Sequence, residues 1–157
     1  MKKLIVLISI ICIGSSLIGC GKQQTPNITK ENTILQSSSV NSNVINSQEF
    51  IKFIEKSGYK TNTSKQDGNS ILTGSLTIVN INGNTIGMYE YKSSEDMEQE
   101  AKTIRADGSM IGNTIYDWKS KPHFYKGGNI IVSYIGENKE ILEIIQRFMG
   151  QQFAGAI

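Results

Sequence analysis

The chain has 157 residues, of which 38% are hydrophobic and 19% are charged, with 16 basic and 14 acidic side chains. Lys2 and Lys3 account for the whole formal charge of +2, so the rest of the chain is balanced in charge. A balanced chain has no basic field to attract nucleic acid, and we therefore exclude nucleic-acid binding.

The first segment, residues 1–19, has the order of an export signal. Lys2 and Lys3 form a charged start, residues 4–13 are mostly apolar, and small residues follow before Cys20. A membrane-spanning helix needs roughly 20 mostly apolar residues. This run is shorter and is interrupted at residues 14–16, so we predict a cleaved signal peptide over residues 1–19.

The end of this segment, Leu17-Ile18-Gly19-Cys20, resembles the lipobox of bacterial lipoproteins. The resemblance implies that a diacylglycerol is attached to the Cys20 sulfur, that the chain is cut before this residue, and that the product sits on the extracytoplasmic face of the cell membrane. Two or more acyl chains hold a protein firmly, because each buried methylene contributes about 0.8 kcal/mol. An ordinary secretory signal and an uncleaved anchor are the alternatives.

Cysteine chemistry depends on this processing. Cys12 leaves with the signal peptide, and lipid occupies the sulfur of Cys20. We therefore expect neither thiol catalysis nor a disulfide nor a cysteine metal site.

Residues 20–44 are predicted to be the lipidated cysteine and a flexible polar tether. The segment is rich in Gln, Thr, Asn and Ser and contains no aromatic residue, so it cannot bury enough apolar surface to offset the entropy of ordering. A flexible chain of this length spans about 25 to 30 Å in root-mean-square terms. Residues 45–157 remain as a single domain of ordinary size.

Three later segments have the apolar spacing and the capping residues of helices. The first starts at Asn46, which has capping-box spacing to Glu49, and stops at Gly58. The other two are predicted over about 93–107 and 138–149.

Two hairpins are predicted between these helices. Asn82-Gly83 suits a turn whose two central residues both need positive φ, and Gly127-Gly128 similarly divides the second pair of strands. The predicted strands are 76–81, 85–91, 123–125 and 130–135. The order helix, hairpin, helix, hairpin, helix predicts an α+β domain with a four-stranded antiparallel sheet and the helices on one face.

Catalytic and metal chemistry have little support. His123 is the single histidine, and no Gly-x-Ser-x-Gly nucleophile elbow accompanies it. Neither a Gly-x-Gly-x-x-Gly fingerprint nor a P-loop occurs, and the acidic residues at 95–100 lack the spacing of a calcium loop. We predict no catalytic residue, no metal and no cofactor.

Aromatic side chains near the second hairpin are the best binding candidates. With Gly127-Gly128 as the turn, Tyr125 would face Ile130 and His123 would face Val132. Exposed aromatics of this kind can stack on a sugar ring or accept a protein partner, while packing in the core is the alternative. The predicted binding residues are Tyr116, Trp118, His123 and Tyr125.

These observations favour a membrane-anchored lipoprotein with a small non-enzymatic domain that binds a protein, cell-wall or small-molecule partner. A small extracytoplasmic hydrolase that uses His123, and an inhibitor or accessory subunit of a membrane complex, are the alternatives. The folded part also resembles small lipoproteins of unknown function from Gram-positive bacteria, in its runs His123-Phe124-Tyr125 and Phe153-Ala154-Gly155. That resemblance implies no activity.

Overall fold

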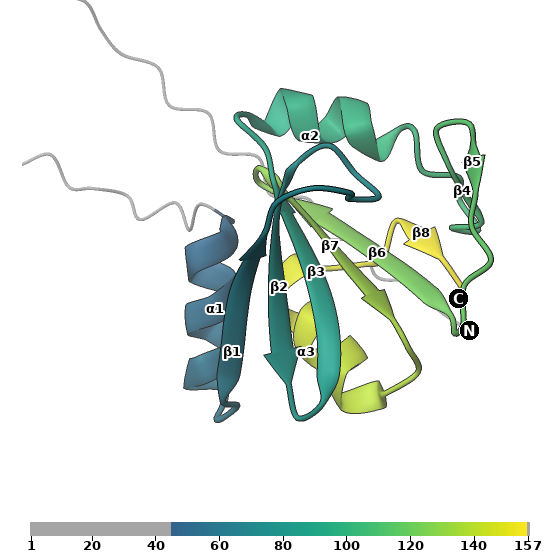
Figure 1. Cartoon of the computed structure of the whole chain (residues 1–157). Helices are drawn as coiled ribbons and strands as arrows, with labels where there is room; N and C mark the ends of the chain where they lie inside the picture. Colours follow the sequence, from purple (N-terminus) through teal and green to yellow (C-terminus); the bar gives the residue numbers. More distant parts are fainter. Residues whose placement is uncertain (1–44, 157) are drawn as a thin grey trace, which may run out of the picture. The chain divides into compact units, whose positions relative to one another are not determined.

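The computed structural model describes residues 45–156, so the predicted signal peptide, lipobox and tether lie outside the described residues. The described part contains three helices, a large antiparallel sheet and a small separate hairpin (Figure 1). The helices are α1 (Ser47–Lys56), α2 (Ser94–Ala101) and α3 (Lys139–Met149). The strands are β1 (Thr61–Gln66), β2 (Ser75–Ile81), β3 (Asn84–Glu90), β4 (Met110–Ile111), β5 (Thr114–Ile115), β6 (Pro122–Gly127), β7 (Ile130–Ile135) and β8 (Ala154–Gly155).

The predicted α+β class and the three helices are confirmed, but the main sheet has six strands rather than four. Its order is β1-β2-β3-β7-β6-β8, with antiparallel pairing throughout. The four predicted strands form its centre. The two strands that were not predicted, β1 and β8, form its edges, where one is wholly polar and the other has two residues.

Capping residues fix the helix starts as predicted. The side chain of Asn46 accepts a hydrogen bond from Glu49 N at 3.0 Å, and Ser93 and Asn138 cap α2 and α3 in the same way. The predicted end of the second helix was wrong, because α2 stops at Ala101 and not at residue 107. Ile104 instead forms a β-bridge with Ile111, which takes the chain out of the helix.

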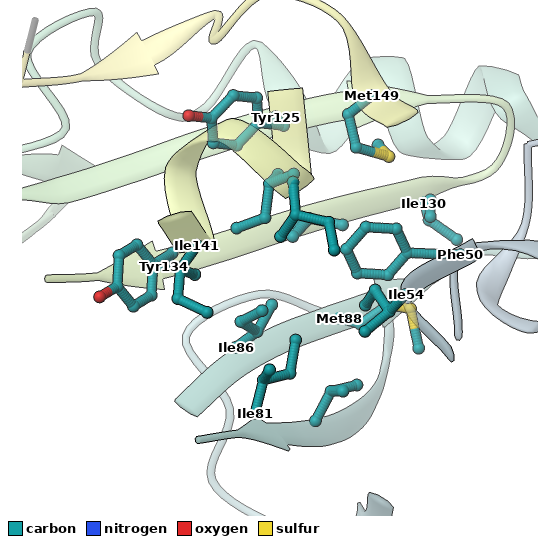
Figure 2. Close-up of a cluster of buried hydrophobic side chains, with 14 residues drawn as sticks. Phe50, Ile54, Ile81, Ile86, Met88, Tyr125, Ile130, Tyr134, Ile141 and Met149 are labelled. Atoms are coloured by element: carbon teal, nitrogen blue, oxygen red, sulfur yellow. The ribbon is translucent and has the colours of Figure 1, made fainter. Parts of the chain in front are cut away.

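The sheet is covered on both faces, which corrects the prediction that all helices share one face. On one face α1 and α3 pack against alternate strand residues such as Ile81, Met88 and Ile130 (Figure 2). On the other face Met97 and Ala101 of α2 pack with residues that include Leu76, Tyr89 and Ile131. We call these the α1/α3 face and the α2 face.

The register of the second hairpin also differs from the prediction. Its two-residue turn is Gly128-Asn129, so Tyr125 pairs with Val132 and His123 pairs with Tyr134. Gly128 has φ +56°, and a Cβ added there would lie 1.9 Å from the carbonyl oxygen of Ile45. The turn therefore needs glycine at its first central position, as in a type II′ turn.

Candidate functional site

The four predicted binding residues lie on opposite faces of the sheet. Tyr116 and Trp118 stack at 4.8 Å between ring centroids and pack, half-buried, on the α2 face. The indole Nε1 of Trp118 donates a hydrogen bond to Gly108 O at 2.7 Å. Tyr125 is buried in the cluster of the α1/α3 face, and His123 is buried beside it on the same strand. These four residues therefore do not form one surface.

His123 is held in a structural contact. Its side chain is 6% exposed, its ring lies 6.3 Å from the Tyr134 ring, and its Nδ1 shares a 2.6 Å hydrogen bond with Gln152 Oε1. Gln152 Nε2 donates in turn to Ala156 O at 3.0 Å, so Oε1 is the acceptor and Nδ1 carries the proton. His123 Nε2 is buried and has no partner in the described part of the chain. No hydroxyl or carboxylate there bonds to the ring, so a relay for hydrolysis is not assembled among residues 45–156.

A polar recess of about 540 Å³ lies beside α2 and the end of β3. Tyr91 lines it, and the Tyr91 hydroxyl is buried without a hydrogen-bond partner among the described residues. Burial is the main cause that raises the pKa of the Tyr91 phenol, and the nearby Glu100 carboxylate raises it further. Two of the acidic residues that line the recess accept hydrogen bonds, Glu90 from Ser47 Oγ and Glu100 from Thr73 Oγ1. Across residues 45–156 no three acidic, histidine or cysteine side chains converge on a metal position.

Apolar surface is nearly all covered in the part of the chain that the structure describes. Ile115, 75% exposed at the β4–β5 hairpin, is the one large hydrophobic side chain there that is exposed. A recess of about 440 Å³ lies between α1 and α3, and its apolar lining consists of Ile45, Phe53 and Phe148. The Phe53 and Phe148 rings lie 5.2 Å apart, and the Arg147 guanidinium lies 5.8 Å from the Phe53 centroid. The apolar surface of residues 45–156 is therefore limited to Ile115 and to this half-buried recess, which Glu49, Lys52, Lys56 and Arg147 also line.

The two edges of the sheet differ sharply. At β8, Gly155 N donates to Ala106 O at 2.9 Å, so the loop after α2 occupies that edge. At β1, Figure 1 shows the strand at the opposite side of the sheet, paired with β2 alone. Unpaired edge groups are a template for another strand. Within residues 45–156, one edge of the sheet is thus closed, and the other has no further strand beside it over six residues.

The hydrogen-bond alternation shows which backbone groups of β1 point outward. Tyr91 directly follows β3, and its N–H donates to Asn129 O at 2.9 Å. The N–H and C=O groups of odd-numbered β3 residues therefore point to β7, and those of even-numbered β3 residues point to β2. The registers of β3 with β2 and of β2 with β1 continue this alternation. The N–H and C=O groups of even-numbered β2 residues point to β1, where their partners are Asn62, Ser64 and Gln66. The N–H and C=O groups of Thr61, Thr63 and Lys65 therefore point away from the sheet.

The side chains of β1 leave this edge accessible. All six are polar, and those from Asn62 to Gln66 are exposed. Thr61 Oγ1 donates to Glu55 Oε1 at 2.8 Å, which places an exposed carboxylate at the start of the strand. Lys65 stands at the other end and makes no ion pair with any residue in the described range. We call residues 61–66 with the Glu55 carboxylate the β1 edge.

Sequence reasoning missed the β1 edge because Thr-Asn-Thr-Ser-Lys-Gln has no apolar alternation. The β-branched residues Thr61 and Thr63 were the one available sign of a strand.

Comparison of the chain with models of protein families, with curated proteins and with solved structures finds no match. None of the described helices has the length and apolar character that crossing a membrane requires.

Proposed function

We propose that the chain is a lipoprotein anchored through Cys20 to the extracytoplasmic face of the cell membrane, with a non-enzymatic domain that binds an extended polypeptide along the β1 edge. The observation that carries this proposal is the open edge itself, with the backbone groups of Thr61, Thr63 and Lys65 directed outward. An extended segment that adds a strand gains affinity from main-chain hydrogen bonds. Such binding needs no apolar patch, in agreement with the covered surface of the described domain.

A non-enzymatic role is supported by the surroundings of His123. Its Nδ1 is engaged by Gln152 and its other nitrogen is buried, so substrate would reach neither nitrogen without movement of the domain. The lipid anchor and the tether of residues 20–44 would keep the domain close to the membrane while leaving its edge free to turn toward a partner.

Photo-crosslinking in the cells that make the protein tests this proposal. A photoreactive residue at Asn62 or Ser64, whose side chains are exposed on the α2 side of β1, is expected to give a discrete product. The same residue at Thr85, exposed on β3, is expected to give none. Mass spectrometry of the product should identify one extended segment of the partner.

A pair of proline variants distinguishes backbone pairing from side-chain contact. Thr63→Pro removes an outward N–H and leaves the bonds to β2 in place, so we expect the domain to stay folded and the crosslink to disappear. Ser64→Pro removes an N–H that β2 uses and is expected to destabilise the domain. A crosslink that persists in a folded Thr63→Pro variant, or equal crosslinking from Thr85, would contradict binding at the β1 edge.

A further inference from the structure

We infer that the polypeptide bound at the β1 edge is the same strand of a second copy, so that two domains form a dimer with one continuous sheet. This inference rests on the proposed use of the edge and names its partner. In an antiparallel pair around a two-fold axis, each strand offers the same groups to the other. The outward groups of β1 allow this arrangement because they alternate regularly along the strand.

One register uses every outward group. If the two-fold axis passes beside Thr63, then Thr63 faces Thr63 of the second copy, and Thr61 faces Lys65 of the second copy at both ends. All three facing pairs are then of the hydrogen-bonded kind, giving roughly six main-chain hydrogen bonds. A shift by one pair in either direction leaves the outward N–H and C=O groups of one end residue in each copy without a partner.

Charge complementarity favours a second copy in this register. Glu55 is held beside Thr61 by the 2.8 Å hydrogen bond, and both side chains lie on the α1/α3 side of the sheet. Lys65 lies on the same side, opposite Thr77 of β2. A two-fold axis perpendicular to the sheet places the α1/α3 faces of both copies on the same side of the joined sheet. Lys65 of each copy therefore meets Glu55 of the other. Two exposed charges that lack an ion pair within residues 45–156 become paired twice.

The facing side chains also fit one another. Thr63 would meet Thr63, and Asn62 would meet Ser64 of the second copy, and such small hydroxyl and amide pairs are favourable across antiparallel strands. The proposed lipid anchor would also favour the dimer, since two copies on one membrane surface have a high effective concentration.

Disulfide trapping of the full-length protein in its own membranes tests the register. A hydrogen-bonded facing pair has Cα atoms about 5.5 Å apart, within disulfide range. Thr63→Cys is therefore expected to give a disulfide-linked dimer under mild oxidation. Gln66→Cys is the matched control, because its copies would lie about 20 Å apart along the strands in this register. Dimers from the wild type and from every variant alike would indicate a free Cys20 thiol and would count against the lipid anchor.

Charge reversal provides a second, independent readout. Glu55→Lys and Lys65→Glu should each weaken the dimer about tenfold, measured as the dissociation constant of the detergent-solubilised protein, because each replaces two attractions with two repulsions. The combined variant should regain most of that affinity. Absence of the Thr63→Cys disulfide in folded protein, or a combined variant as weak as the single ones, would overturn the dimer. A crosslink from Asn62 to a different protein would overturn the dimer while supporting the proposed function.

Discussion

Replacing Phe50 with alanine is expected to lower the free energy of unfolding by about 3 to 5 kcal/mol, a large part of the total for a small domain. Phe50 is fully buried on α1 among the side chains drawn in Figure 2. Its ring lies 5.3 Å from that of Phe148 on α3. Truncation removes the apolar contacts and leaves a cavity where the two helices meet the sheet. Urea unfolding followed by the fluorescence of Trp118, the single tryptophan, measures the change.

Ile115→Ala is the matched control, because the same kind of truncation is made at a side chain that is 75% exposed. Its effect should stay within about 0.5 kcal/mol. Equal destabilisation by the two substitutions would contradict the assignment of Phe50 to the core.

Cys20→Ser is expected to abolish acylation and to eliminate the mature lipidated form. The proposed anchor depends on this one sulfur, and two or more acyl chains are needed for stable attachment. Intact-mass measurement of protein from its own cells should show a lipid-modified N-terminal Cys20 in the wild type. In the variant it should show no lipid mass.

Cys12→Ser is the control for this experiment, because Cys12 lies in the predicted leader and should leave the mature mass unchanged. An unmodified thiol at Cys20 in the wild type, or the same products from both substitutions, would contradict the anchor.

Local signals predicted the elements whose ends are fixed by neighbouring residues. Asn46 and Asn138 mark helix starts, and Asn82-Gly83 forms the predicted turn, with φ +48° and +79°. The second turn shifted by one residue because two adjacent glycines were available, and contact with Ile45, far away in the sequence, selects Gly128.

The sequence of β2 indicates the two-sided packing of the sheet. Leu76 and Ile78 point to the α2 face, while Val79 and Ile81 point to the α1/α3 face. A strand that is apolar on both sides indicates a sheet covered on both faces. The prediction assumed one covered face and therefore placed α2 wrongly.

The candidate site was hard to predict for a physical reason. The aromatic residues near His123 are close together in the sequence, yet alternation along β6 directs His123 and Tyr125 to one face and Phe124 to the other. The β1 edge depends on what lies beside a strand, which only the assembled sheet determines. Its polar side chains carry no signal of their own.

Residue-resolved hydrogen exchange of the protein in membranes from its own cells tests most directly whether the β1 edge is bound. If it is, the amides of Thr63 and Lys65 should exchange as slowly as that of Ser64, which β2 protects in every case. Free exchange at Thr63 and Lys65 beside a protected Ser64 would show an unused edge and would contradict the account.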